Sequence, residues 1–373
     1  MKKKAPEADC ETLIPLLIGV WRRFHKLAGP GDKLQTREFR SVVEGVQKIQ
    51  AGKPIGQDKD MLGAYLLYDW IIHYQQALSL INELPHTPRR VLDICSGSAP
   101  MAFAALKHGA SDVVAVDRNA AALQLGAEVC GRYGFPLTVR EADCTKGPIP
   151  VEGKFDLIIV GHCLEELFPA AQKEWPVRQK AFVDSLLRRL TPQGFLLLVD
   201  SSLNETNRRI LMLRDQLVSE GVPVQAPCVW RGECPALKAA NSPCYAQREL
   251  VKPYMIKEIQ RAAQINLSSL KMSYLILRHP EAGWPALPDL PLYRIISPPV
   301  ETYQGKRFYL CGTDGKKNLG SHLKEHPLES RAFEYLRRGE LISIEHALVK
   351  DNSLDIIEGT ILKVVAAAGK AID

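Results

Sequence analysis

The spacing of apolar and polar positions changes near residue 90, and this change predicts two kinds of structure. Before residue 90, apolar residues recur at the three- and four-residue intervals of helices in the segments 13–28, 39–50 and 61–84. Pro85 and Pro88 follow the third segment and end it. The pattern therefore predicts an N-terminal helical domain over residues 1–85.

From residue 90 onward, short apolar runs alternate with segments of helical spacing. The runs predicted as strands are 91–94, 112–117, 137–140, 155–160 and 194–199. Five β–α units in series predict a parallel sheet that helices cover on both faces. Ligands of such sheets bind at the carboxyl ends of the strands. The expected fold class is thus α/β, with this domain spanning residues 86–280.

The regular alternation stops after Gly221. A loop-like, cysteine-rich segment follows, and we place an insertion of the α/β domain at residues 223–250. The pattern then predicts strands at 272–277, 293–296 and 307–310, and a helix at 331–338. Residues 281–373 are predicted to form a β-containing C-terminal extension.

The composition is that of an ordinary globular protein, with 46% hydrophobic and 24% charged residues. It contains no run of 18 apolar residues, and its basic start lacks a following hydrophobic region. Both observations argue against a membrane partner and against a secretory signal. We therefore expect a cytoplasmic protein.

The net charge of +6 is unevenly distributed. Residues 1–90 carry 14 basic and 10 acidic side chains, residues 91–200 carry 11 and 13, and residues 201–300 carry 12 and 8. A mildly acidic centre with basic flanks is compatible with an RNA partner. A solvated surface without a nucleic-acid partner explains the same charges.

A glycine-containing turn with the sequence Asp-Ile-Cys-Ser-Gly-Ser-Ala-Pro joins the first predicted strand to its helix, beginning at Asp93. Such a turn lets backbone amides and a helix N-terminus approach a ligand closely. Asp117 ends the second strand, where it can accept hydrogen bonds from both hydroxyls of a ribose. Asp143 follows the third strand, where it can accept a hydrogen bond from an adenine amino group.

This arrangement resembles class I S-adenosylmethionine-dependent methyltransferases. The G-x-G-x-x-G spacing of nicotinamide dehydrogenases is absent. The resemblance implies that the methionine end of the cofactor is lined by Asp93, Gly97 and Ala99, its ribose by Asp117 and its adenine by Asp143. Cys95 and Ala99 stand where the family commonly has glycine. The alternative is a degenerate domain that is retained only as a scaffold.

The chain has nine cysteines, an odd number that argues against a disulfide framework. Three lie close together with the spacing Cys228-x5-Cys234-x9-Cys244, and Cys311 lies far downstream. Four thiolates can hold a [4Fe–4S] cluster or a tetrahedral zinc ion. Structural zinc favours closely paired cysteines, which are absent here, so the spacing favours the cluster. Zinc and unliganded thiols remain alternatives.

Together these features resemble the small-ribosomal-subunit methyltransferase-like family, whose mitochondrial members act as assembly factors. The motifs that carry the resemblance are 91–98 (VLDICSGS), 155–167 (FDLIIVGHCLEEL), 194–200 (GFLLLVD), 227–235 (PCVWRGECP), 273–278 (SYLILR) and 310–315 (LCGTDG). They cover roughly residues 60–340. The resemblance implies a [4Fe–4S] cluster on the four cysteines and binding to small-subunit ribosomal RNA or a pre-ribosomal particle.

The sequence leaves open whether the protein is an enzyme, and no catalytic residue is assigned. The Asn/Asp-Pro-Pro-aromatic motif of many amino-nitrogen methyltransferases is missing after the fourth strand. Cys163 and His162 could supply a nucleophile and a base there, although a packed cysteine explains Cys163 more simply. Three functions remain: an rRNA methyltransferase, a non-catalytic RNA-binding assembly factor with a vestigial pocket, and a small-molecule methyltransferase with structural zinc.

Overall fold

A computed structural model describes residues 6–29, 31, 33–56, 58–240, 242–303 and 305–372, with side chains from residue 9 onward. The basic start at residues 1–4, used above in judging a secretory signal, lies outside these residues. The chain divides into two compact units. One contains residues 1–81, 87–161 and 249–270, and the other contains residues 82–86, 162–248 and 271–373.

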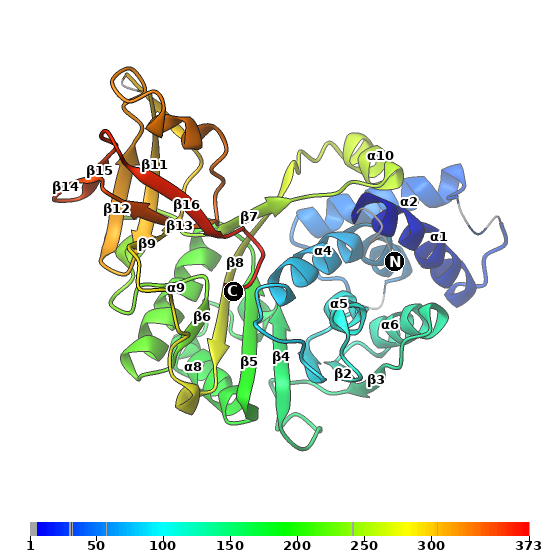
Figure 1. Cartoon of the computed structure of the whole chain (residues 1–373). Helices are drawn as coiled ribbons and strands as arrows, with labels where there is room; N and C mark the ends of the chain where they lie inside the picture. The colour runs from blue at the N-terminus through cyan, green and yellow to red at the C-terminus, as the bar shows by residue number, and fades with distance from the viewer. Residues whose placement is uncertain are drawn as a thin grey trace. The chain divides into compact units, whose positions relative to one another are not determined.

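The first unit contains four parallel strands in the order β3-β2-β1-β4 (Figure 1). The strands are β1 (Arg90–Ile94), β2 (Asp112–Asp117), β3 (Thr138–Glu141) and β4 (Phe155–Gly161). Two helices connect consecutive strands, α5 (Pro100–His108) between β1 and β2, and α6 (Ala120–Tyr133) between β2 and β3. This order is the one found in doubly wound α/β folds. The predicted α/β class is confirmed.

The helices before β1 belong to the same unit. They are α1 (Pro6–Phe24), α2 (Thr36–Gln50), α3 (Lys59–Ala64), the π-helix η1 (Tyr65–Asp69) and α4 (Trp70–Ile81). Helix α1 packs on α6, α4 packs on α5, and α10 (Tyr254–Ala263) packs on α2. The helical pattern of the sequence is confirmed here, whereas the boundary of a separate domain at residue 85 stays a prediction.

The second unit contains β5 (Leu190–Asp200), against which β8 (Ser269–Arg278) pairs antiparallel. Strand β6 (Val224–Ala226) also pairs antiparallel with β8, and β7 (Ala246–Glu249) pairs with it too. The helices of this part are α7 (Leu164–Leu167), α8 (Trp175–Leu187) and α9 (Asn204–Ser219). The helical segment after β4 is divided between α7 and α8 by residues 168–174, which include Pro169.

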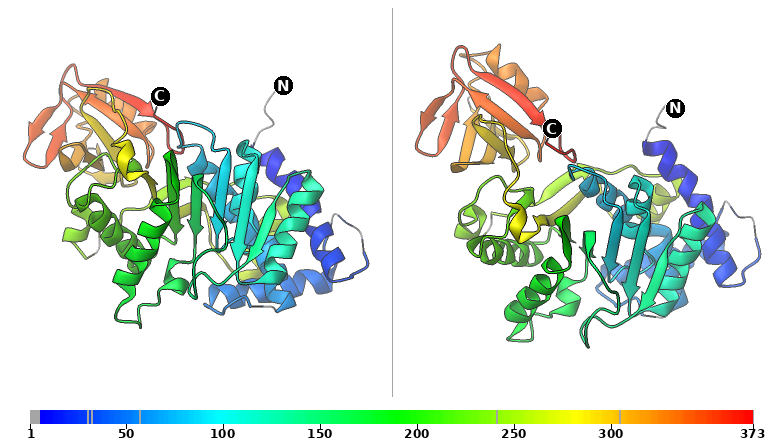
Figure 2. Two further views of the ribbon diagram at one scale, coloured as in Figure 1. Left: turned by 90° about the horizontal axis from the view of Figure 1, so that it is seen from below. Right: turned by 60° about the horizontal axis from the view of Figure 1, so that its bottom comes forward.

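Strands between residues 292 and 366 form a second sheet, the orange-to-red part of Figure 2. Its order is β14-β15-β12-β11-β9-β13-β16, and β10 pairs with β11. Its strands are β9 (Leu292–Ile295), β10 (Val300–Thr302), β11 (Gly305–Gly312), β12 (Gly315–Gly320), β13 (Leu341–Glu345), β14 (Leu348–Lys350), β15 (Ser353–Asp355) and β16 (Ile361–Ala366). Phe308, Leu310 and Ile342 are among the residues of its buried core.

The helix predicted at 331–338 is wrong. The structure has only a short 3₁₀ helix at Glu329–Glu334, followed by strands β13 to β16. Phe333 packs into the sheet core beside Phe308, so tertiary burial rather than helical periodicity explains the apolar positions of this segment.

Candidate functional site

The loop after β1 is a tight turn held by left-handed backbone conformations. Cys95, Gly97 and Ala99 have φ angles of +56°, +54° and +58°. Ala99 caps α5, and Pro100 is the first helical residue. A Cβ atom on Gly126 of α6 would lie 2.9 Å from the Ala99 Cβ, so Gly126 makes room for the loop. Ala99 is fully buried against α6, which explains how alanine fits where the family commonly has glycine.

Asp117 ties this loop to the end of β2. The Gly97 amide donates a 2.8 Å hydrogen bond to Oδ2, and the Asn119 amide donates a 2.8 Å hydrogen bond to Oδ1. Each carboxylate oxygen has a second lone pair, and the side chain is partly exposed. Asp117 can therefore accept two further hydrogen bonds, which is the number that a ribose diol offers.

Asp93 is almost completely buried, and its Oδ2 accepts a 2.9 Å hydrogen bond from the Ala102 amide in the first turn of α5. Burial raises the pKa of Asp93 to about 8, against the opposing effect of that hydrogen bond. The observed contact joins β1 to α5. A direct contact of Asp93 with a ligand stays a prediction.

Asp143 follows β3 at the same edge of the sheet, since β2 and β3 pair Asp117 with Glu141. Its Oδ1 accepts hydrogen bonds from the Thr145 hydroxyl at 2.6 Å and from the Thr145 amide at 3.0 Å. These bonds lower the pKa of Asp143 to about 2, so the side chain is a carboxylate at neutral pH. An ionised acceptor at this position suits an amino group.

Two further side chains contact the loop and were not assigned from the sequence. The Trp70 indole donates a 3.0 Å hydrogen bond to the Ser98 carbonyl oxygen, and the Tyr65 ring lies against Gly97. Both come from the segment 59–81, whose apolar spacing indicated only a core-facing helix. Nothing in this spacing indicated a contact with the loop.

In the second unit, one face of α9 holds the cysteine-rich segment. Asn207 donates to the Cys244 carbonyl oxygen at 2.7 Å and accepts from the Cys244 amide at 3.2 Å. Two turns further along α9, Asp215 accepts a hydrogen bond from the Cys234 amide at 2.9 Å. Its neighbour Arg214 donates to the Trp230 and Gly232 carbonyl oxygens. Helical spacing brings these polar side chains to the same side of α9.

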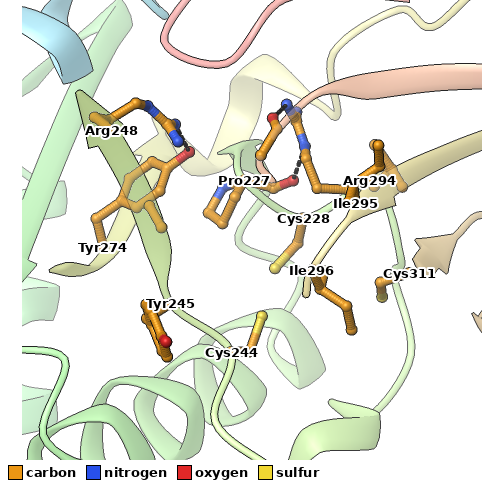
Figure 3. A pocket seen from close by; sticks show the side chains of 13 residues that line it. Pro227, Cys228, Cys244, Tyr245, Arg248, Tyr274, Arg294, Ile295, Ile296 and Cys311 are labelled. Atoms are coloured by element: carbon orange, nitrogen blue, oxygen red, sulfur yellow. Dashed lines mark hydrogen bonds between the residues drawn. The ribbon is translucent and has the colours of Figure 1, made fainter. Parts of the chain in front are cut away.

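The segment and the second sheet together enclose a cavity of about 50 Å³. Cys228, Cys244 and Cys311 line it, and the sulfur atoms of Cys228 and Cys244 point into it (Figure 3). Cys234 is buried beside Cys244. Among the residues that the structure describes, no three Cys, His, Asp or Glu side chains are arranged as ligands of one metal ion. The metal site therefore stays a prediction.

Burial is the main cause of the raised pKa values of these thiols, with a further contribution from their neighbouring thiols. It raises the pKa of Cys234 to about 11 and that of Cys244 to about 12, and it raises the pKa of Cys311 as well. Without a bound cation, these three side chains are neutral thiols at pH 7.

Two buried arginines lie close to this cavity: Arg294 lines it, and Arg338 packs on Tyr245, which also lines it. Arg294 is 7% exposed and donates to two backbone oxygens, those of Pro227 at 3.1 Å and Gly339 at 2.9 Å. Arg338 is 9% exposed and lies over the Tyr245 ring at 3.6 Å. Within the described part of the chain, neither has a carboxylate within ion-pair distance. Buried cations require a compensating negative charge. Arg338 interacts electrostatically with Cys244, and Arg294 lines the cavity together with Cys228, Cys244 and Cys311.

His162 and Cys163, considered above as base and nucleophile, also lie in the second unit. His162 has a φ of +53°, and its Nδ1 lies 3.9 Å from Oδ1 of Asp200 at the end of β5. Burial lowers the pKa of His162 to about 4, so the imidazole is neutral at pH 7. Cys163 is 5% exposed and is the N-cap residue before α7, which fits the interpretation of a packed cysteine.

Comparison with known proteins finds a sequence relative, similar solved structures and a matching family model. A segment of 137 residues, 36% of this chain, is 28% identical to the ribosomal protein L11 methyltransferase of Syntrophotalea carbinolica. That segment spans only 39% of the relative.

Solved structures with a similar arrangement include two methyltransferases. N-methyltransferase NodS of Bradyrhizobium japonicum in complex with S-adenosyl-L-homocysteine is 14% identical, with a TM-score of 0.38 over 65% of this chain and 99% of that one. The ribosomal protein L11 methylase of Lactobacillus delbrueckii subsp. bulgaricus is 14% identical, with a TM-score of 0.34 over 55% of this chain and 78% of that one.

The family model described as mitochondrial small ribosomal subunit Rsm22 matches residues 64–332. The match includes the loop after β1, Asp117, α9 and all four cysteines around the cavity, and it covers well over half of the chain. It agrees with the resemblance read from the sequence motifs. The chain belongs to the mitochondrial small ribosomal subunit Rsm22 family.

Proposed function

We propose that this protein binds S-adenosylmethionine and acts on the RNA of the small ribosomal subunit, with a structural [4Fe–4S] cluster in its cysteine-lined cavity. This proposal rests on membership of a small-subunit family and on the Gly97–Asp117 contact at the strand edge. The class I methyltransferase fold is proposed on the same grounds.

The residues of the loop edge fit the cofactor. Asp117 keeps two acceptor lone pairs for a ribose, and Asp143 is an ionised acceptor for an adenine amino group. Gly97 and Ala99 belong to a turn of backbone amides beside the N-terminus of α5. When bound, S-adenosylmethionine supplies an electrophilic methyl group. The residues at this edge hold and orient it.

The cavity in the second unit fits a metal–thiolate centre by its chemistry. A [4Fe–4S] core with four thiolates carries a net charge of about −2, and a zinc ion with four thiolates carries the same charge. Arg294 and Arg338, both buried without a carboxylate partner among the described residues, would balance it. The charge supports a metal centre of either kind. The wide cysteine spacing is our reason for proposing iron and sulfide rather than zinc.

The proposed substrate class is small-subunit ribosomal RNA, as free RNA or within a pre-ribosomal particle. The neutral His162 beside Asp200 is a possible acceptor for a proton, but nothing in its contacts assigns it to catalysis. An assembly factor that binds the cofactor without transferring its methyl group is the second candidate, favoured by the missing amino-methyltransferase motif.

The deciding experiment supplies purified small-subunit particles with S-adenosylmethionine that carries a radioactive methyl group. Label in the RNA supports a methyltransferase, and it should disappear in Asp117→Ala. Stable binding to the particles without label in RNA supports the assembly factor. Failure to bind either RNA or particles contradicts both, and would leave the small-molecule methyltransferase with structural zinc.

No described helix is long and apolar enough to cross a membrane. The cytoplasmic location expected from the sequence stays a prediction, since the family description refers to a mitochondrial ribosomal subunit.

A further inference from the structure

A tyrosine from the helices before β1 lies directly on the loop after β1. If Gly97 carried a Cβ atom, that atom would lie 3.2 Å from the Tyr65 hydroxyl oxygen and 3.3 Å from its ring carbon Cε1. Gly97 also has a φ of +54°, which side chains rarely adopt. Because Gly97 has no side chain, the Tyr65 ring can lie this close to the loop.

The π-helix explains how two side chains of one helix reach the same loop. The Trp70 amide bonds to the Tyr65 carbonyl oxygen, five residues back. Residues five apart are about 140° apart around an α-helix, whereas a π-helical turn brings them close to the same side. Tyr65 then contacts Gly97, and the Trp70 indole donates to the Ser98 carbonyl oxygen at 3.0 Å.

The Tyr65 hydroxyl also lies 3.3 Å from Nδ1 of His73, which follows eight residues later in α4. A hydroxyl offers one donor and two acceptor lone pairs. With Nδ1 protonated, His73 donates to Tyr65, and the O–H of Tyr65 is directed to another acceptor. This is the tautomer in which the Tyr65 hydroxyl can donate to a ligand, whereas in the other tautomer it donates to His73.

We infer that Tyr65 is a cofactor-binding residue whose hydroxyl donates a hydrogen bond to the carboxylate at the methionine end of S-adenosylmethionine. This inference rests on the proposed cofactor binding. Gly97 is the residue expected at that end of the cofactor, and Tyr65 is the hydroxyl in contact with it. A carboxylate is a strong acceptor for such a donor.

The test compares two ligands by calorimetry. S-adenosylmethionine has the methionine end, whereas adenosine has only the ribose and adenine that Asp117 and Asp143 would hold. Tyr65→Phe should weaken S-adenosylmethionine about tenfold and change adenosine affinity less than twofold. Tyr68→Phe is the matched control, because Tyr68 lies in the same π-helix but its hydroxyl contacts Gln260. It should leave both affinities unchanged.

The outcomes separate this inference from the proposed function. Equal weakening of both ligands by Tyr65→Phe would mean that Tyr65 only shapes the loop, and would overturn the inference. Unchanged affinity for S-adenosylmethionine would overturn it as well. If the unsubstituted protein binds neither ligand at millimolar concentration, the proposed cofactor binding fails and the role of Tyr65 fails with it.

Discussion

The Gly97 amide and the Asp117 carboxylate are joined by a 2.8 Å hydrogen bond that connects the loop after β1 to the end of β2. The two residues are 20 positions apart, and parallel pairing of β1 with β2 brings them together. The acid therefore positions the loop and also keeps lone pairs for a ligand.

Asp117→Ala should strongly weaken the binding of S-adenosylmethionine. It removes two charge-assisted hydrogen bonds to the ribose and the support of the Gly97 amide, a loss on the order of 2–4 kcal/mol of binding free energy. Calorimetry measures the change in affinity for S-adenosylmethionine. Asp112→Ala is the matched control, because Asp112 begins the same strand and forms only a partly exposed ion pair with Arg90. Equal affinities of Asp117→Ala and the unsubstituted protein would exclude Asp117 from the site.

Asp69 should make folding stability depend on pH. It is buried at the end of the π-helix, its Oδ2 has no hydrogen-bond partner among the described residues, and burial raises its pKa from 3.8 to about 7. The folded state therefore holds the proton more tightly than the unfolded state. Its contribution is fully present below pH 4 and is lost as the pH rises to about 7.

Asp69→Asn should consequently stabilise the protein at pH 8 by on the order of 2–4 kcal/mol, and have a much smaller effect at pH 4.5. Denaturant unfolding of both proteins at the two pH values measures the difference. Asp93, whose pKa is also raised by burial, contributes equally to both proteins and cancels. The same gain at both pH values would show that charge on Asp69 is not the cause.

Strands β1, β2 and β4 of the first unit could be predicted because each is a short, mostly apolar run with its own boundaries. Val91 to Ile94 is fully buried in β1, and the acids that follow the strands mark the carboxyl edge that parallel pairing creates. Local sequence information therefore sufficed to predict that Asp117 and Asp143 lie at this edge.

Contacts that depend on packing between distant segments could not be predicted in this way. Nothing in the spacing around Tyr65 indicates that Gly97 lies beneath it, 32 residues later. The buried arginines are a second example, because Arg294 and Arg338 look like surface charges in the sequence. Only the pairing of β9 with β13 and the neighbouring turn bring them to the cysteines. The helix at 331–338 was wrongly predicted because Phe333 and Leu336, which pack into the core of the second sheet, have helical spacing.

Affinity for small-subunit RNA should fall steeply with salt concentration. If the basic flanks contact about six phosphates, affinity should drop roughly 10³-fold between 50 and 200 mM salt, because each contact releases counterions. Filter binding or fluorescence anisotropy over this range measures the slope. Arg209 is not expected to be one of these phosphate contacts. It is buried and donates to the Phe168 carbonyl oxygen and to the Gln179 side chain. A flat salt dependence would contradict phosphate contacts.

The iron–sulfur proposal predicts a coloured protein. Protein purified without oxygen should be brown, with a broad absorption band near roughly 400 nm and about four iron and four sulfide per chain. Replacing Cys228, Cys234, Cys244 or Cys311 by Ser should remove the colour and lower the unfolding temperature. The segment between β6 and β7 has few buried apolar residues of its own, so it depends on its ligand for stability.

Cys130→Ser and Cys163→Ser provide the controls, because both side chains are buried thiols outside the cavity. They should keep the colour, whatever they do to stability. Zinc in place of iron in protein never exposed to air would contradict the cluster and leave the four ligands in place. Full metal content in Cys311→Ser would contradict the ligand assignment instead. Cys311 is the most informative position, since it reaches the cavity from β11 of the second sheet while the other three belong to the segment that α9 holds.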